Sequence, residues 1–497
     1  MNNPADLTAI EARQLISRRK LSPVELATSC IARVEALNPA VNALVAFDFG
    51  RMMDEARAAE AKVMAGEPLG ALHGLPLGVK DMIDVAGLPT TFGSEIFRDN
   101  RAVKDDAMVK AVREAGAIVL GKTNNPEWSA GANTRNAVYG VTANPHDLTK
   151  SCAGSSGGSA VALACGMCPI ATGTDTGGSL RNPAAFCGVV GFRPSPGVVP
   201  DDMRGLALLP LATPGPMART VADAALLLSV QMRPERLDPW TSVIDGRTHW
   251  RPEDFRRLPR FDLSTLRIAA SEDFGFAPTE RIIRESFRAK IAALEGHFAV
   301  LDGAHPNCAE ADRAFAILRA LSFLGLHHGL MLKHPDKIGP NVRANIEEGL
   351  GYSALDVAEG LNLQARLYRN WQRFFETTDY VLTPAVTISP RDWHELYPAE
   401  IDGTPTQSYY HWLALAYAPT LAGHPAITIP AGLDRAGMPF GLQIIGRRHD
   451  DLGTLAVAAE LEALFAADAE LRPVSPDLAA LAKARPIREA EGFFGFT

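Results

Sequence analysis

Short apolar runs that alternate with helical or glycine-rich segments constrain the fold of this chain most strongly. Four of them lie between residues 75 and 195, with the sequences LPLGVK (75–80), AIVLGK (117–122), PIATGT (169–174) and VVGFRPS (189–195). Short runs that are apolar throughout are typical of strands in a sheet covered by helices on both faces. The sequence therefore predicts an α/β fold.

Similar runs return later in the chain, at 265–271, at 379–386 and twice within 426–446. Apolar residues at helical spacing predict helices in the first 70 residues and over 279–296, 308–333 and 341–375. Because strands on both sides of the Pro- and Arg-rich connection 232–263 are expected to share one sheet, we predict one domain over residues 1–497. Its parts are N-terminal helices (1–70), a core segment (71–230), a variable substrate-side region (231–420), and strands and helices that return to the core (421–497).

The composition narrows the class of protein. Apolar residues make up 47% and charged residues 21% of the chain, as in a folded enzyme-sized protein. The net charge of -8 provides no basic footprint for nucleic acid, so we expect no such partner. The longest apolar stretch, 160–172, is broken by Gly166 and Pro169, and residues 1–6 have no secretory pattern. We therefore expect no membrane segment and a cytoplasmic protein.

One lysine is a candidate base. Lys80 ends the apolar run 75–80, where burial would disfavour its ammonium form and lower its pKa. A neutral lysine can accept a proton. An exposed lysine paired with Asp81 or Asp84 would fit the same local sequence.

Two Gly/Ser-rich tracts supply candidate nucleophiles. Ser155 lies in CAGSSGGSA (152–160) and Ser179 in GTDTGGSLRNPAAFCG (173–188). The consecutive amides of Thr176, Gly177, Gly178 and Ser179 can point at one spot and form an oxyanion hole. A glycine-rich turn would explain one tract, but not two tracts together with an apolar lysine.

Two short segments match general functional motifs, but the residues around them do not fit the structure that each motif requires. GAIVLGKT (116–123) fits a phosphate-binding loop, but its apolar residues are expected to be a strand rather than a loop. GSSGG (154–158) fits a nucleophile elbow with Ser156 at its centre, but a polar loop precedes it in place of a strand. His327, His328 and His334 lie in a Leu-rich run without other ligands, so we expect no metal site.

The tracts around Lys80, Ser155 and Ser179 resemble the amidase signature family, as do TNNPEW (123–128), GPMARTVAD (215–223) and GHPAITIPAG (423–432). The resemblance covers most of the chain. It implies one α/β/α domain around a large mixed sheet, amide hydrolysis, and no metal or cofactor. One departure is visible, since Cys152-Ala153-Gly154 stands where a Gly-Gly pair is common.

The resemblance also implies a Ser-cisSer-Lys triad, with Ser179 as nucleophile, Ser155 as the bridging serine and Lys80 as base. Asp175 and Arg181 flank the nucleophile, and we expect them to hold the loop rather than react. The resemblance suggests that Ser129 and Gly131 border the acyl side of the substrate pocket.

Aromatic residues indicate the substrate. Six of the 14 Trp and Tyr residues fall between positions 393 and 417, Tyr409 and Trp412 among them. This segment is either a packed excursion or a substrate-facing lid, and a lid would favour aryl or apolar amides.

Three functions stay open: a hydrolase of small amides, the glutamine-hydrolysing A subunit of a tRNA-dependent amidotransferase, and a nucleotide-binding protein. The missing Glu-Ala-Ser-Ser-Asn-Leu tract favours the hydrolase. The sequence does not separate amides from carbamates or esters. It leaves the oligomeric state open, with a homodimer as one option.

Overall fold

A single eleven-stranded sheet takes strands from both ends of the chain. The computed structural model describes residues 3–241, 243–244 and 247–495. The strand order is β1-β3-β2-β6-β8-β7-β16-β17-β13-β11-β12. Their bounds are β1 (Leu44–Ala46), β2 (Pro76–Lys80), β3 (Ile118–Thr123), β6 (Ile170–Asp175), β7 (Val190–Arg193), β8 (Thr213–Ala218), β11 (Arg267–Ala270), β12 (Val300–Asp302), β13 (Tyr380–Pro384), β16 (Ala426–Leu433) and β17 (Pro439–Ile445).

The sheet is mixed. β2 runs parallel to β3 and β6, and β11 runs parallel to β12 and β13. The central strands β8, β7, β16 and β17 pair antiparallel. Three two-stranded sheets lie outside it: β4 (Arg135–Asn136) with β5 (Gly140–Val141), β9 (Val243–Ile244) with β10 (Arg247–Thr248), and β14 (Glu400–Ile401) with β15 (Thr404–Pro405).

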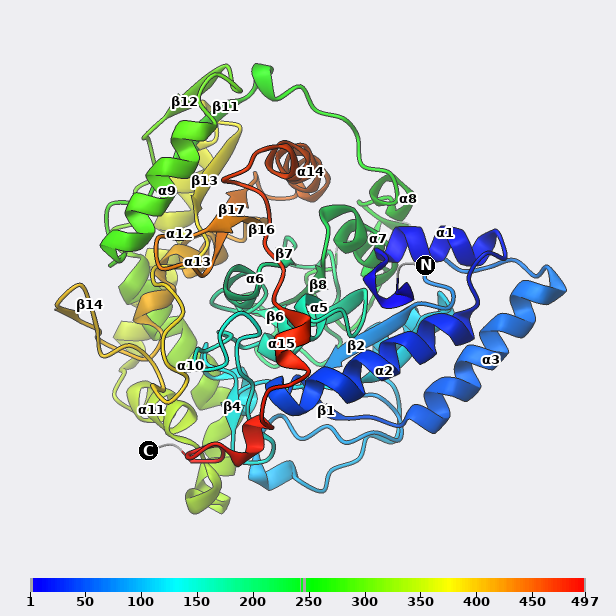
Figure 1. The fold of residues 1–497 in the computed structure, drawn as a ribbon. Coiled ribbons are helices and arrows are strands. Elements are labelled where there is room, and N and C mark those ends of the chain that lie inside the picture. Colours follow the sequence, from blue (N-terminus) through cyan, green and yellow to red (C-terminus); the bar gives the residue numbers. More distant parts are fainter. Residues whose placement is uncertain (1–2, 242, 245–246, 496–497) are drawn as a thin grey trace.

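Helices cover both faces, and two large apolar clusters fill the space between sheet and helices. Figure 1 shows α1 to α3 at one end of the molecule and α9 to α12 at the other. The helices are α1 (Ala9–Ser17), α2 (Pro23–Val41), α3 (Phe49–Ala65), α4 (Ala107–Glu114), α5 (Gly157–Ala164), α6 (Arg181–Cys187), α7 (Val221–Gln231), α8 (Pro252–Phe255), α9 (Arg281–Ala293), α10 (Ala311–Lys333), α11 (Pro340–Leu350), α12 (Ala354–Phe374), α13 (Ala414–Leu421), α14 (Asp451–Ala467) and α15 (Leu478–Leu481). This arrangement confirms the predicted α/β class.

Two local expectations differ from the structure. The run 341–375 is two helices, because Ser353 caps a new one with its hydroxyl and Asp356 completes the capping box. The sequence does not predict β8, since this strand carries Pro214 and Pro216. Its residues 213–216 pair only with β6, because β7 pairs with β8 at Met217 and Ala218 alone, and a strand with one partner tolerates proline.

In the described part of the chain, α10 is the one helix long and apolar enough to cross a membrane by length and composition. Its neighbours are α11, α12 and α13, and 44% of the apolar window is buried inside the protein. A core helix passes the same test, so this is weak evidence for a membrane segment.

Candidate active site

Lys80 lies at the end of β2, completely buried in the sheet. Its backbone N–H donates to Thr172 Oγ1 at 3.0 Å, which ties the strand end to β6. Its Nζ donates to three hydroxyls: Ser155 Oγ at 2.7 Å, Thr174 Oγ1 at 2.9 Å and Ser156 Oγ at 3.0 Å. Within the described residues no carboxylate forms a salt bridge with Lys80, so the exposed, Asp-paired alternative is wrong.

The environment of Lys80 favours its neutral form. Burial lowers the pKa of Lys80 to about 7, although the charge of Asp175 opposes the shift. A neutral lysine amine keeps two N–H donors and gains a lone pair. It can therefore donate to two of the three hydroxyls while it accepts a proton from the third.

Ser155 lies in the tract that leads into α5, and the peptide bond between Gly154 and Ser155 is cis. Ser155 is completely buried. The glycines that follow it have no room for side chains, since a Cβ at Gly158 would lie 2.3 Å from the backbone nitrogen of Asn124. The close approach of this tract to its neighbours explains its small residues.

Ser179 lies in the short loop between β6 and α6, with 9% of its surface exposed. The backbone N–H of Ser156 donates to the carbonyl oxygen of Ser179 at 3.2 Å, which holds the two Gly/Ser tracts side by side. The described structure contains no hydrogen bond between the hydroxyls of Ser155 and Ser179. A side-chain hydrogen bond therefore joins Lys80 to Ser155, whereas a backbone hydrogen bond from Ser156 holds Ser179 beside them.

Asp175 and Arg181 form hydrogen bonds that hold this loop. Asp175 accepts from the N–H groups of Gly178 and Leu180 at 2.9 and 3.1 Å, and from Arg181 at 2.8 and 3.0 Å. Burial by itself would raise the pKa of Asp175, but the Arg181 guanidinium outweighs it and holds that pKa far below its usual range. Arg181 also donates to Gln443 and Thr420, so both side chains are occupied inside the protein.

The same contacts change the expected oxyanion hole. The Gly178 N–H is used by Asp175, so it is not free to bind an oxyanion. The amides of Thr176, Gly177 and Ser179 donate no hydrogen bond within the described residues. Three of the four expected donors thus stay available.

Ser156 lies at the start of α5, after an irregular loop. Its Oγ accepts from Lys80, and like Ser155 it is completely buried. Because no strand precedes it, the nucleophile-elbow geometry is absent here. Ser156 is nevertheless a second serine within reach of the lysine.

The phosphate-loop motif is a strand, as expected: residues 118–123 are β3. Lys122, at its end, is buried and forms an ion pair with Asp81 at 3.1 Å. Its Nζ also donates to Thr90 Oγ1 and to the carbonyl oxygen of Pro89. A lysine held in this way has no donor left for a phosphate.

Ser129 ends the short 3-10 helix η3 (Glu127–Ser129), and Gly131 follows it near Asn341 of α11. Ser129 has a φ of +57°, and its hydroxyl is buried without a hydrogen-bond partner in the described residues. A Cβ at Gly131 would lie 2.8 Å from Nδ2 of Asn341. The φ of Gly131 is +134°, so a larger residue there would be strained and would displace the Asn341 side chain.

The aromatic segment 393–417 does not behave as one lid. Trp393 packs with Val141, Ala143, Ile487 and Phe493 in a small separate cluster. Tyr409, Tyr410, Trp412 and Tyr417 are each at most 5% exposed. Of the two alternatives, the packed excursion describes the segment as a whole, because most of these rings are core residues.

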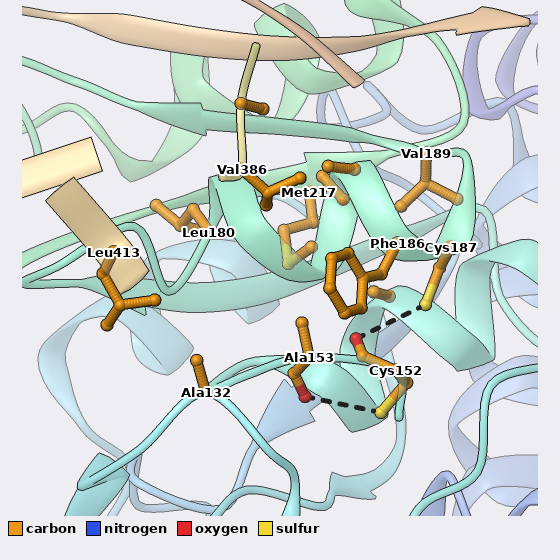
Figure 2. Packing of buried hydrophobic residues seen from close by; sticks show 14 of the residues in the cluster. Ala132, Cys152, Ala153, Leu180, Phe186, Cys187, Val189, Met217, Val386 and Leu413 are labelled. Atoms are coloured by element: carbon orange, nitrogen blue, oxygen red, sulfur yellow. Dashed lines mark hydrogen bonds between the residues drawn. The ribbon is translucent and has the colours of Figure 1, made fainter. Parts of the chain in front are cut away.

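One part of that segment does reach the loop that carries Ser179. A Cβ at Gly177 would lie 3.6 Å from Leu413 Cδ1, and one at Gly178 would lie 2.5 Å from the Cβ of Ala416. Trp412, beside Leu413, lines a groove with Ala132, Ser151, Phe186, Ile388 and Tyr397. Figure 2 shows Leu413, Ala132 and Phe186 gathered from separate segments into one apolar cluster.

Sequence reasoning missed two neighbours of the reacting groups. Thr174 gives no obvious signal, although it lies in the Ser179 tract one residue before Asp175 and contacts Lys80. Phe315 on α10 lies 3.2 Å from the position of a Gly177 Cβ. More than 130 residues separate Phe315 from that loop, so no local pattern could have indicated it.

Comparisons with known proteins identify the family of this chain. The amidase family model matches residues 25–455. An acylamidase of Rhodococcus erythropolis is 32% identical over 461 residues, which cover 92% of this chain and 95% of the relative. The glutamyl-tRNA(Gln) amidotransferase of Alkaliphilus metalliredigens has an A subunit that is 30% identical, and the match covers 92% of this chain and 96% of that relative.

Among solved structures, a bacterial aryl acylamidase of the amidase signature family superimposes with a TM-score of 0.85 at 27% identity. The match covers 96% of this chain and 99% of that structure. Family model, relatives and fold agree over nearly the whole chain. The chain therefore belongs to the amidase signature family and is an amide-hydrolysing enzyme.

Proposed function

We propose that this enzyme hydrolyses small aryl or apolar amides through a serine acyl-enzyme. Ser179 is the nucleophile, Ser155 the bridging residue and Lys80 the base. One observation carries the proposal: a completely buried lysine with a pKa of about 7 lies 2.7 Å from Ser155 Oγ, in the tract that adjoins the Ser179 loop.

The proton moves in two steps. Ser179 Oγ attacks the amide carbon while its proton passes to Ser155 Oγ, and the Ser155 proton passes to the neutral amine of Lys80. The reverse transfer protonates the departing amine, after which water cleaves the acyl-enzyme by the same path. The contacts of Lys80 with Thr174 and Ser156 hold the amine toward Ser155 during both transfers.

The oxyanion of the tetrahedral intermediate is stabilised by backbone N–H groups of the loop. Those of Thr176, Gly177 and Ser179 are the candidates, because Gly178 donates to Asp175. The Asp175 and Arg181 pair supports this geometry without touching the substrate.

The substrate preference rests on the surroundings of the loop. Phe315 and Leu413 approach Gly177, so apolar groups on the substrate find apolar contacts there. Trp412, the residue before Leu413, lines a groove whose lining includes no residue of the Ser179 loop. The acylamidase and aryl acylamidase relatives support this class. We assign Ser129 and Gly131 to the acyl side, and Tyr409 to the packing behind the pocket.

Labelling with a serine-directed fluorophosphonate tests the nucleophile. We expect Ser179→Ala to lose labelling and turnover while it stays folded, because it lacks the hydroxyl that is acylated. Ser156→Ala is the matched control and should still be labelled. Labelling that persists in Ser179→Ala and disappears in Ser156→Ala would assign the nucleophile to Ser156.

The glutamine-hydrolysing component of an amidotransferase is the second candidate, because relatives from such enzymes are 30 to 32% identical over most of the chain. The two functions differ in substrate. We expect the purified chain to turn over acetanilide faster than glutamine, with parallel assays on a carbamate and an ester. Faster release of ammonia from glutamine would favour the amidotransferase function.

A further inference from the structure

Arg319 on α10 is a buried cation without a carboxylate partner. Only 4% of the surface of Arg319 is exposed. In the described part of the chain no carboxylate oxygen lies within 4.0 Å of its guanidinium. Two other arginines with buried side chains do have one: Arg181 lies 2.8 Å from Asp175, and Arg204 lies 3.0 Å from Asp238. Buried charges in proteins are usually paired, so Arg319 is an exception that calls for a partner.

The groups around Arg319 are aromatic rings. Its guanidinium carbon lies 4.8 Å from the ring centre of Phe323, 5.3 Å from Tyr409, 5.6 Å from Tyr410 and 5.8 Å from Phe315. Such contacts stabilise a cation in part but do not neutralise it. The acidic side chain of Glu348 is one ring away, where it accepts from the Tyr410 hydroxyl at 2.9 Å.

Hydrogen-bond donors exceed acceptors at this point. Nε of Arg319 donates to the Tyr409 hydroxyl oxygen at 2.9 Å, Nη2 donates to the same oxygen, and Asn345 Nδ2 donates to it at 2.6 Å. Nη1 donates no hydrogen bond within the described residues. A guanidinium matches the two oxygens of a carboxylate better than one phenol oxygen. The site therefore suits an acceptor-rich, negatively charged group.

Arg319 shares its helix with a residue that approaches the Ser179 loop. Phe315 lies four residues before it, on the same face of α10, and contacts the position of a Gly177 Cβ at 3.2 Å. Four residues of helix span about 6 Å, close to the length of a benzene ring. A substrate ring beside Phe315 would thus bring a substituent toward the guanidinium.

We propose that Arg319 is a specificity-determining residue. It binds a carboxylate at the end of the substrate that is remote from the scissile amide. The substrate class is then an aryl amide that carries a carboxylate. This inference rests on the proposed function and narrows its substrate.

Matched substrate pairs test the inference without any mutation. One pair is 4-acetamidobenzoate and 4-acetamidobenzamide, with the charge on the amine side; the other is succinanilate and its carboxamide, with the charge on the acyl side. In at least one pair, kcat/KM of the carboxylate should exceed that of the neutral carboxamide by about 10- to 100-fold, as expected for hydrogen bonds to a charged group. A ratio near or below one in both pairs would overturn the inference.

Variants then assign the effect to the residue. Arg319→Met should bring the preferred pair's ratio close to one, whereas Arg319→Lys should keep part of it. Arg313→Met is the control on the same helix, because Arg313 pairs at the surface with Asp356 and Glu359, and it should keep the wild-type ratio. A folded Arg319→Met enzyme with the wild-type ratio would contradict the assignment.

A binding measurement separates this inference from the proposed function. Benzoate should raise the Tm of the wild-type protein more than benzyl alcohol does, and Arg319→Met should lose that difference. Failure of Ser179 labelling together with this benzoate effect would reject the catalytic proposal alone. Normal labelling without any benzoate or carboxylate preference would reject the role of Arg319 alone.

Discussion

At the scale of residues, the site depends on one buried amine. Lys80 is surrounded by hydroxyls rather than carboxylates, and burial lowers its pKa to about 7. An ordinary lysine would be protonated at neutral pH and could not act as a base. In the proposed mechanism, burial makes Lys80 a base. The same burial lowers the stability of the folded state, because it disfavours the charged ammonium form.

The pH dependence of catalysis follows from this pKa. The proposed mechanism requires neutral Lys80, so kcat/KM should rise with pH through an apparent pKa near 7 and level off above it. A pH series on a neutral amide measures this limb. Lys80→Met should lack both the activity and the limb, and substantial turnover by that variant at neutral pH would place the base elsewhere.

The free energy of unfolding should also depend on pH, because Lys80 has different pKa values in the folded and unfolded states. Unfolded Lys80 keeps its proton up to about pH 10.4, whereas folded Lys80 loses it above about 7. Between these values the unfolded state binds more protons, so this group adds stability to the wild type as pH rises. The Tm of wild type relative to Lys80→Met should therefore increase from about pH 7 to 10. A difference that is constant over this range would show that Lys80 is charged in the fold.

Gly178 is constrained by its backbone and its neighbours. Its φ is +98°, and a Cβ there would lie 2.4 Å from Asn182 Oδ1 and 2.5 Å from Ala416 Cβ. Gly178→Ala should shift the Ser179 loop and lower kcat by about 100-fold or more, because small misplacements are costly in catalysis. Gly303→Ala, where no atom lies within 4 Å, should leave kcat unchanged. Wild-type kcat in Gly178→Ala would mean that the loop geometry is not critical.

At the scale of elements, the short η6 helix (His411–Leu413) and α13 pack against the loop that carries Ser179. Leu413 and Ala416 approach Gly177 and Gly178, while α10 brings Phe315 to the same place from another part of the chain. Arg181 fastens α6 to this region by donating to the carbonyl oxygen of Ala416. The surroundings of this loop therefore come from two parts of the chain that are distant in sequence: α10, and the contiguous segment of η6 and α13.

Two tryptophans in the aromatic segment should behave differently. Trp412→Ala should lower kcat/KM on an aryl amide more than on a small aliphatic amide, by about 1 to 3 kcal/mol of differential transition-state binding. Trp393→Ala should lower Tm without changing that ratio, because Trp393 packs in a separate cluster. Equal losses on both substrates in Trp412→Ala would mean that this ring only supports the fold.

At the scale of the whole molecule, the two ends of the chain complete one sheet. β16 pairs with β7, and β17 connects β16 to β13, so strands after residue 425 lie in the middle of the sheet. A fragment that ends after Gln231 would leave β7 without β16. We expect this fragment to aggregate rather than fold, because it exposes an apolar strand edge. A soluble fragment with cooperative unfolding would show that the first half is a domain of its own.

The sequence by itself determined which apolar runs form buried strands. The runs at 75–80, 117–122, 169–174 and 379–386 are strands, because apolar length without helical spacing is a local property. It also indicated the reactive residue types, since a lysine in an apolar run and serines among glycines are unusual. The sequence did not predict the strand β8, because its two prolines disfavour a strand locally.

Only the tertiary structure decided which groups meet. The contact between Lys80 and Ser155 spans 75 positions, and Phe315 and Ala416 reach the Ser179 loop from more distant elements still. Only the fold directed the Gly178 amide to Asp175, and only the fold left Arg319 buried without a carboxylate. The physical reason is that burial, pKa and hydrogen-bond partners depend on neighbours in space, which a local sequence pattern does not contain.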